Sequence, residues 1–333
     1  MTQRPDIARG GSSVLAICGG VGGAKLALGL YRVLEPGRLT VLVNTGDDFE
    51  HLGLHISPDI DTVLYTLGGL ADPERGWGRR DETWACMEAL KALDAESWFL
   101  LGDKDLAVHI ERTRRLKAGE TLSGIVGGFA RHFGIAAEIV PMSDDPVRTL
   151  LDSDEGELTF QQYFVARQCQ PKVHAISFAG AEAARAPQAI LDGLGGAAYD
   201  AVVLCPSNPL LSIDPILRIE TLRGALAATP SPVIAVSPLV GGQALKGPAA
   251  KLMKELGHAA SVEGIADHYR GLIDGLVIDT LDRDHASGLR VASLPTQTVM
   301  RSLEDRERLA RDCIAFSAEL AERRLPSARR AGC

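Results

Sequence analysis

Short apolar runs alternate along the chain with segments whose apolar residues recur at helical spacing. The runs typical of buried strands cover 14–18, 39–43, 98–101, 138–140, 173–178, 201–205, 233–237 and 276–279. The helical segments begin near residue 24 and at Ser57–Pro58, and continue over 83–93, 122–133, 187–194, 214–227, 248–256 and 303–323. Strands that alternate with helices in this way predict a doubly wound, mostly parallel sheet, which is an α/β, Rossmann-like fold.

Periodicity also suggests how the chain is divided. Residues 1–13 resemble a flexible leader, and residues 14–333 are expected to form a single Rossmann-like domain. Within that domain the periodicity weakens over 149–170, which predicts a hairpin with a short helix, a smaller lid or excursion from the main sheet. Residues 301–333 are expected to be a C-terminal helix and tail.

The first strand ends in a glycine-rich loop that contains Gly19, Gly20, Gly22, Gly23 and Lys25. A strand, a glycine loop and a helix together can turn backbone N–H groups and a helix N-terminus toward a phosphate. The loop matches neither the Walker A motif nor the dinucleotide fingerprint, because it lacks the Lys-Ser/Thr pair and the third glycine. A tight turn that only packs the helix on the strand is the alternative. If the loop binds phosphate, changing Gly22 to Val should weaken nucleotide binding and leave the fold largely intact.

Polar clusters follow the carboxyl ends of most predicted strands. They are the glycine loop and residues 44–48, 102–105, 143–145, 206–209 and 282–284. In a doubly wound sheet these segments would share one rim, and ligands bind at that rim near the switch in strand order. The sequence therefore predicts phosphate-ligand chemistry at the carboxyl ends of the strands.

The predicted rim is rich in aspartate and has few cations, chiefly Lys25, Lys104, Arg112 and Lys246. Carboxylates would repel a phosphate ligand unless a metal ion lay between them, and oxygen ligands of this kind favour Mg²⁺. Asp47 and Asp48 are the first candidate ligands and Asp61 is the next. Since adjacent side chains usually point in different directions, we expect one of Asp47 and Asp48 to bind the metal. The alternative explanation for Asp59 and Asp61 is structural, because the dipole of a helix favours carboxylates in its first turn.

Two histidines, His51 and His55, stand four residues apart beside these carboxylates. That spacing would suit metal ligands on a helix, but Gly53 between them disfavours a helix. We therefore interpret both His51 and His55 as residues that line the pocket or cap the loop, in preference to metal ligands. No Cys–His pair and no G-x-S-x-G elbow indicates a covalent nucleophile. Transfer from a diphosphate to a substrate hydroxyl, with magnesium and a carboxylate base, fits these residue types better.

Charge and composition restrict the partners. The net charge of −8 argues against broad binding of nucleic acid or a membrane surface. The N-terminus has no run long enough for a signal sequence, and no run approaches the length that spans a membrane. Six cysteines lack C-x-x-C spacing, which suggests neither a disulfide framework nor a zinc site. We therefore expect a cytoplasmic protein.

Six ordered motifs resemble those of the 2-phospho-L-lactate transferase family of coenzyme F420 biosynthesis. They cover residues 19–25, 44–48, 57–62, 102–105, 141–146 and 206–209. Residues 160–163 and 247–250 add further matches, and the resemblance extends over about residues 14–300. Residues 75–84, Arg-Gly-Trp-Gly-Arg-Arg-Asp-Glu-Thr-Trp, are most similar to the bacterial members, which use an enolpyruvyl donor.

The resemblance implies a dimeric, Mg²⁺-dependent enzyme that acts on Fo, 7,8-didemethyl-8-hydroxy-5-deazariboflavin. The ribityl hydroxyl of Fo would attack a guanosine diphosphate-linked three-carbon acid, and GMP would leave. Asp61 is implied as the residue nearest that hydroxyl, and therefore as the catalytic base. The implied nucleotide-binding residues are Gly19, Gly20, Gly22, Gly23, Lys25, Pro206, Ser207 and Asn208. The implied substrate-binding residues are Asp48, His55, Asp59, Asp61, Asp103, Lys104, Met142, Ser143 and Asp144.

The same superfamily includes non-catalytic regulators that bind nucleotide sugars, so a binding role is the alternative to transfer. A nicotinamide dehydrogenase is disfavoured because the dinucleotide glycine pattern is absent. The sequence leaves open whether the acid is lactyl, enolpyruvyl or glyceryl.

Overall fold

A seven-stranded parallel sheet forms the centre of the molecule. The computed structural model describes residues 12–244 and 247–324, so most of the expected leader, Lys246 and the end of the expected tail lie outside the described residues. The strand order is β14-β13-β10-β9-β1-β2-β5. These strands are β1 (Val14–Cys18), β2 (Leu39–Val43), β5 (Glu138–Pro141), β9 (Ala201–Leu204), β10 (Val233–Val236), β13 (Gly275–Asp279) and β14 (Ala292–Thr296). The α/β prediction is confirmed.

Both faces of this sheet are covered by helices, which is why its strands are continuous apolar runs. In β1, Val14, Ala16 and Cys18 belong to the core on one face, and Leu15 and Ile17 belong to the core on the other. The first face is covered by α1 (Gly20–Val33), α2 (Pro58–Leu67), α5 (Leu122–His132) and α11 (Leu303–Arg324). The second is covered by α6 (Gln188–Gly195), α7 (Asp214–Leu217), α8 (Glu220–Ala228), α9 (Ala249–Glu255) and α10 (Val262–His268). The helix expected over 214–227 is thus two helices.

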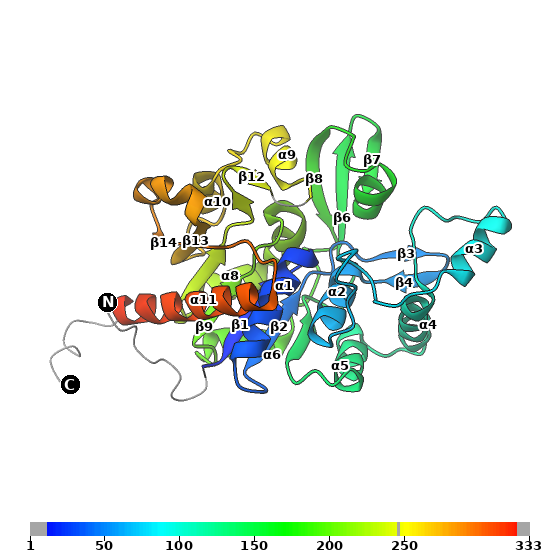
Figure 1. Ribbon diagram of the computed structural model, residues 1–333, viewed down its shortest axis with the longest axis horizontal. Helices are drawn as coiled ribbons and strands as arrows, with labels where there is room; N and C mark the ends of the chain where they lie inside the picture. The colour runs from blue at the N-terminus through cyan, green and yellow to red at the C-terminus, as the bar shows by residue number, and fades with distance from the viewer. Residues whose placement is uncertain (1–11, 245–246, 325–333) are drawn as a thin grey trace.

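Three small antiparallel sheets stand apart from the main one. β6 (Arg148–Ser153), β7 (Gly156–Thr159) and β8 (Val173–Ala179) form one of them, with the π-helix η1 (Gln162–Ala166) between β7 and β8. This confirms the predicted hairpin and short helix, but it also corrects the strand expected at 173–178, because β8 pairs with β6 and not with the main sheet. The other two are β3 (Phe49–His51) with β4 (Leu54–Ile56), and β11 (Leu239–Val240) with β12 (Gln243–Ala244). Figure 1 shows β6–β8 above the main sheet.

The strand expected at residues 98–101 is wrong. Trp98 and Phe99 lie in a bend, and their rings are 6.0 and 4.9 Å from the ring of Phe49, with His51 beside them. The segment therefore supplies apolar rings to a small satellite core under α3 (Ala85–Ala92) and α4 (Asp103–Lys117). These elements extend to one side of the molecule (Figure 1). Consequently Gly102–Asp105 does not follow a sheet strand.

The order of the strands reverses at the centre of the sheet. From β1 the chain builds outward through β2 and β5, then returns to place β9 on the other side of β1. The crevice between the carboxyl ends of β1 and β9 is therefore the switch point, where such sheets bind ligands. Among the residues that the structure describes, no helix combines the length and apolarity needed to cross a membrane.

Candidate active site

The loops after β1 and β9 are fastened together at the switch point. Ser207 Oγ donates a hydrogen bond to the carbonyl of Gly19 at 2.8 Å and lies 3.2 Å from its N–H. The side-chain oxygen of Asn208 accepts from the N–H groups of Leu210 and Leu211 at the start of η2 (Pro209–Ile213). Two of the predicted nucleotide-binding side chains therefore position the loop backbone.

The glycines are needed for close packing. Helix α1 begins at Gly20 instead of near residue 24, so the loop is largely the first turn of the helix. A Cβ on Gly22 would lie 2.4 Å from the carbonyl oxygen of Pro206, and one on Gly23 would lie 2.5 Å from Ser207 Oγ. Both distances are shorter than van der Waals contact. The expectation that Gly22→Val would leave the fold largely intact is therefore wrong, because the valine would collide with backbone.

The start of α1 still offers an anion-binding face. Gly20, with φ +64°, donates its N–H to Asp59 Oδ1 at 2.5 Å. The N–H groups of Val21 and Gly22 lie in the first turn of α1, where N–H groups have no acceptor four residues earlier within the helix. Lys25 Nζ lies 3.4 Å from the carbonyl oxygen of Met300. Two amides and the positive end of the helix dipole are thus available to a phosphate.

Four aspartates follow β2 or lie in the first turn of α2, and each is buried. Asp47 and Asp48 follow β2, and Asp59 and Asp61 lie in the first turn of α2; all four are 2–6% exposed. We call Asp47, Asp48, Asp59 and Asp61 the acidic cluster. Asn44, which the sequence analysis did not single out, connects two members: its Nδ2 donates to Asp59 Oδ2 at 2.9 Å and lies 3.4 Å from Asp47 Oδ1. The signal that could have identified Asn44 is its place at the start of the polar segment that follows β2.

The acidic cluster carries more negative charge than its neighbours compensate. Burial, followed by the charges of Asp59 and Asp48, raises the pKa of Asp47 well above its ordinary value, although Arg148 opposes the shift. Burial raises the pKa of Asp59 to about 6, against the hydrogen bonds from Asn44 and Gly20. Asp48 Oδ2 accepts from Ser57 Oγ at 2.8 Å, whereas Asp48 Oδ1 is buried without a hydrogen-bond partner among the described residues.

These features fit a hard divalent cation. Mg²⁺ binds through one or two carboxylates together with phosphate oxygens and water, and a buried carboxylate oxygen without a donor is available for that purpose. The unpartnered oxygen of Asp48, with the crowded carboxylate of Asp47 beside it, fits the expectation that one of these two residues is a metal ligand; which of them binds stays a prediction.

We predict a pH-dependent effect of Mg²⁺ on stability. A carboxyl whose folded pKa is raised stabilises the fold below its unfolded pKa, about 3.9, and this contribution is lost as pH rises through the folded value. For Asp59 the contribution is lost between about pH 3.9 and about pH 6, and Asp47 shifts in the same direction. Bound Mg²⁺ offsets the repulsion between ionised carboxylates, while protons compete with it. The rise in Tm caused by Mg²⁺ should therefore be larger at pH 7.5 than at pH 5; an increase that does not change with pH would contradict this account.

Asp61 has a different environment from the other three. Arg112, from α4, is fully buried and donates to both carboxylate oxygens of Asp61, NH1 at 3.0 Å and NH2 more closely. Burial raises the pKa of Asp61, and the charges of Arg112 and His109 oppose that shift. Arg112 thus supplies the positive charge that the rest of the acidic cluster lacks.

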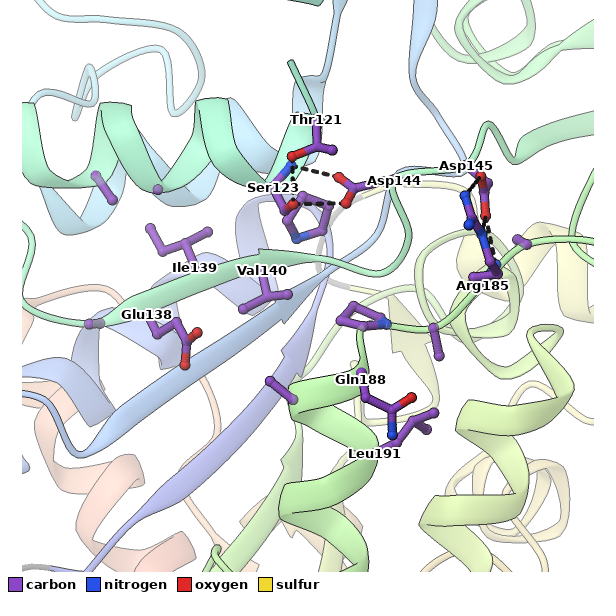
Figure 2. A pocket seen from close by; sticks show the side chains of 18 of the residues that line it. Thr121, Ser123, Glu138, Ile139, Val140, Asp144, Asp145, Arg185, Gln188 and Leu191 are labelled. Carbon is purple, nitrogen blue, oxygen red and sulfur yellow. Dashed lines mark hydrogen bonds and ion pairs between the residues drawn. The ribbon is translucent and has the colours of Figure 1, made fainter. Parts of the chain in front are cut away.

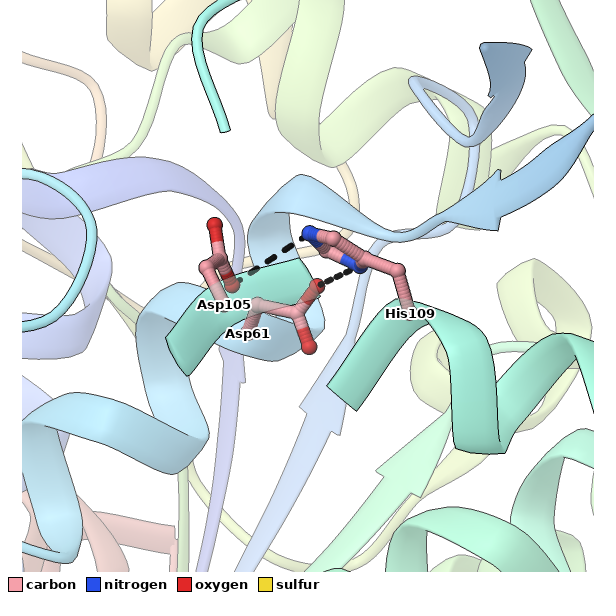
Figure 3. A group of neighbouring side chains, drawn as sticks. All are labelled: Asp61, Asp105 and His109. Carbon is pink, nitrogen blue, oxygen red and sulfur yellow. Dashed lines mark ion pairs between the residues drawn. The ribbon is translucent and has the colours of Figure 1, made fainter. Parts of the chain in front are cut away.

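Asp61, Asp105 and His109 lie close enough to share an ion (Figure 3), since one ligand atom from each falls within 4.8 Å of the others. However, the guanidinium of Arg112 already occupies the carboxylate of Asp61. Burial raises the pKa of Asp105, but His109 and the Tyr65 hydroxyl, 2.5 Å away, outweigh burial and lower it. We therefore interpret this triad as an ion-pair network that connects α2 with α4.

The two histidines point in different directions. In the β3–β4 hairpin, His51 pairs with Leu54 and His55 pairs with Glu50, so the histidines lie on opposite faces. His51 is buried among aromatic rings, and burial lowers its pKa. His55 Nε2 lies 3.1 Å from Asp48 Oδ2. His51 therefore packs with the satellite core and does not line the site, which corrects that part of the interpretation; a pocket-lining role for His55 stays a prediction.

Other predicted substrate-binding residues make structural contacts. Asp103 accepts from Thr83 Oγ1 and from the N–H groups of Ala85 and Cys86, which caps α3. Lys104 Nζ donates to the carbonyl of Asp81 at 2.5 Å. Their contact with substrate stays a prediction.

The segment after β5 behaves similarly. Met142 is fully buried, Ser143 Oγ donates to the carbonyl of Arg185, and Asp144 accepts from the N–H and hydroxyl of Ser123 at the start of α5. Figure 2 shows Asp144 beside a groove of about 1090 Å³ along the outer edge of β5. The structure thus does not bring these three residues into contact with the acidic cluster, and their role in substrate binding also stays a prediction.

Comparison with known proteins identifies the family. The family model described as 2-phospho-L-lactate transferase CofD matches residues 14–315. A phosphoenolpyruvate transferase from Streptomyces coelicolor is 36% identical over 318 residues, which cover 93% of this chain and 99% of that protein. One from Mycolicibacterium smegmatis is 37% identical over 303 residues, covering 85% and 92%. The crystal structure of a member of the UPF0052 family from Bacillus halodurans has the same fold, with a TM-score of 0.62 at 13% identity over 92% of this chain and all of that one. The chain therefore belongs to the 2-phospho-L-lactate transferase CofD family.

Proposed function

We propose that this CofD-family transferase moves a phospho-three-carbon acid from a guanosine diphosphate conjugate to the ribityl hydroxyl of Fo and releases GMP. The observation that carries the proposal is the acidic cluster, which Asp59 joins to the start of α1 at the switch point. Family membership and the motifs in residues 14–300 support the step in coenzyme F420 biosynthesis. Since the relatives are named phosphoenolpyruvate transferases, we propose the enolpyruvyl donor.

The donor's diphosphate would bind where α1 begins. The N–H groups of Val21 and Gly22 and the helix dipole favour an anion there, and Ser207 and Asn208 hold the surrounding loops. Asp47 or Asp48 would hold Mg²⁺, which supplies charge neutralisation for the diphosphate and for the GMP that leaves. The guanosine would extend along the switch-point crevice.

Asp61 is proposed to accept the proton of the ribityl hydroxyl. The hydroxyl oxygen forms a bond to the phosphorus that carries the acid, the bond from that phosphorus to GMP breaks, and the proton passes to Asp61. Burial makes the carboxylate a better proton acceptor by raising its pKa, and Arg112 fixes its orientation. General-base assistance of this kind contributes about 10²–10⁴ in rate.

The alternative is a non-catalytic protein that binds a nucleotide sugar. Such a protein needs only the nucleotide half of the site and has no reason to bind a deazaflavin. Fluorescence titration with Fo distinguishes the two: the transferase should bind Fo saturably, and the absence of binding would contradict the proposal. A homodimer, implied by the resemblance, also stays a proposal, which sedimentation analysis would test.

A further inference from the structure

An exposed aromatic pair lies in the excursion between β7 and β8. The rings of Phe160 and Phe164 stack with their centroids 5.4 Å apart and an interplanar angle of 19°. Phe164 is 40% exposed, and within the described residues no other ring or cation is recorded against it. It belongs to η1, a π-helix, and short π-helical turns occur frequently at functional sites.

This pair is attached directly to the acidic cluster. Gln161, between the two phenylalanines, is 4% exposed, and its Nε2 lies 3.4 Å from Asp47 Oδ2. At the base of the excursion the N–H of Thr149 donates to the carbonyl of Gly46 at 2.6 Å. Phe164 follows Gln161 by three residues in η1, so the backbone that carries its ring continues from a residue in contact with Asp47.

A residue without a side chain, Gly247, lies near one edge of the Phe164 ring. A Cβ on Gly247 would lie 3.9 Å from Phe164 Cε2, and Gly247 has φ +75°. That backbone conformation favours glycine. The space next to the ring is consequently free of a side chain from this position.

The π-helix η1, which carries Phe164, is anchored by the fully buried residue Tyr163. Lys251 Nζ donates to the Tyr163 hydroxyl at 3.2 Å, to the carbonyl of Pro171 at 2.6 Å and to Glu255 at 3.0 Å. These contacts fasten η1 to α9. A preorganised aromatic face loses little conformational freedom when a ligand stacks on it.

We propose that the outer face of Phe164 stacks against the deazaflavin ring of the acceptor. This inference rests on the proposed function. The acceptor must present its ribityl hydroxyl to Asp61 while its planar ring lies a few bonds away, and a stacked aromatic face suits such a ring. Guanine, the other planar group, belongs to the donor that we assign to the switch point. Trp77, also 43% exposed, is already in contact with Arg75 and Trp84.

The test compares Phe164→Leu with Phe164→Trp. Because aromatic stacking contributes substantially per ring, the leucine variant should bind Fo about tenfold more weakly by fluorescence titration, while the tryptophan variant stays within about threefold of wild type. The Kd for GDP, measured by calorimetry, should not change in either variant. Leu93→Ala, which removes a side chain that is 77% exposed on α3's end, is the control and should bind both ligands normally.

Each other outcome contradicts the proposal. Unchanged Fo binding by Phe164→Leu would show that the pair only packs the excursion. Weakened GDP binding with unchanged Fo binding would assign the ring to guanine. Loss of Fo binding in Trp77→Leu, but not in Phe164→Leu, would assign the stacking contact to Trp77 in place of Phe164. If the wild-type protein does not bind Fo at all, that result contradicts both the proposed function and this inference.

Discussion

Replacing Asp61 by Asn should lower kcat by about 10²–10⁴, the usual contribution of a general base. Asparagine retains the shape of the side chain and one oxygen acceptor, but it cannot take a proton at neutral pH. Binding of Fo should persist, since the substituted atom acts in the reaction step. Steady-state kinetics together with the Fo titration measure both quantities.

The same substitution should also lower the melting temperature. Asp61 pairs with the fully buried Arg112, and removal of one partner from a buried ion pair typically costs about 3–5 kcal/mol. A helix-dipole role for Asp61 alone would cost only about 0.3–1 kcal/mol, so a large loss of stability would reflect the pairing with Arg112. Asp105→Asn is the matched control, because it disturbs the same network through His109 and Tyr65; it should lose stability but keep most of its turnover.

If Asp61→Asn retains turnover within a few-fold of wild type and loses only stability, Asp61 is structural and the base lies elsewhere. Asp59 is then the first alternative, since burial raises its pKa to about 6. In that case kcat would fall as the pH drops through about 6, and Asp59→Asn would abolish that dependence. The pH–rate profile therefore separates the two aspartates.

Removal of divalent ions should abolish turnover, and added Mg²⁺ should restore it. The acidic cluster faces a site that must accept a diphosphate, and like charges at close range in a partly desolvated site repel strongly. Asp48 Oδ1 is buried and has no hydrogen-bond donor among the described residues. A bound cation would therefore stabilise this atom most. The measurement is product formation after chelation and after stepwise addition of Mg²⁺.

Two variants sharpen this test. Asp48→Asn should raise the Mg²⁺ concentration needed for half-maximal turnover, because one ligand charge is lost. Glu111→Gln, which changes an exposed carboxylate paired with Arg114 on α4, should leave the requirement as in wild type. Full turnover of the wild-type protein in a chelator would rule out a catalytic metal.

The parallel sheet could be predicted because its strands are buried on both faces and therefore appear as uninterrupted apolar runs. The run at 98–101 is also apolar but joins the satellite core, since Trp98 and Phe99 pack against Phe49 of β3 and do not pair with a strand of the main sheet. Helix α1 begins four residues earlier than expected because tertiary contacts with Pro206 and Ser207 compensate the low helix propensity of glycine.

The candidate site could be predicted only in part. Clustering of aspartates at one rim followed from strand order, but the pairing of Asp61 with Arg112 joins residues 51 positions apart, and nothing local in the sequence encodes it. Gln161 illustrates the same point, since its contact with Asp47 spans 114 positions. The hydrogen bonds of Asp103 and Asp144 to helix starts likewise depend on tertiary contacts.

The central claim is that this protein transfers a phospho-three-carbon acid to Fo. The most direct measurement is mass spectrometry of products after incubation with Fo, Mg²⁺ and, in turn, the enolpyruvyl, lactyl and glyceryl guanosine diphosphate donors. We predict GMP and a phosphodiester of Fo that carries the acid, formed fastest from the enolpyruvyl donor. Formation of no Fo adduct from any donor, by protein that binds GDP normally, would contradict the account and favour a nucleotide-binding role.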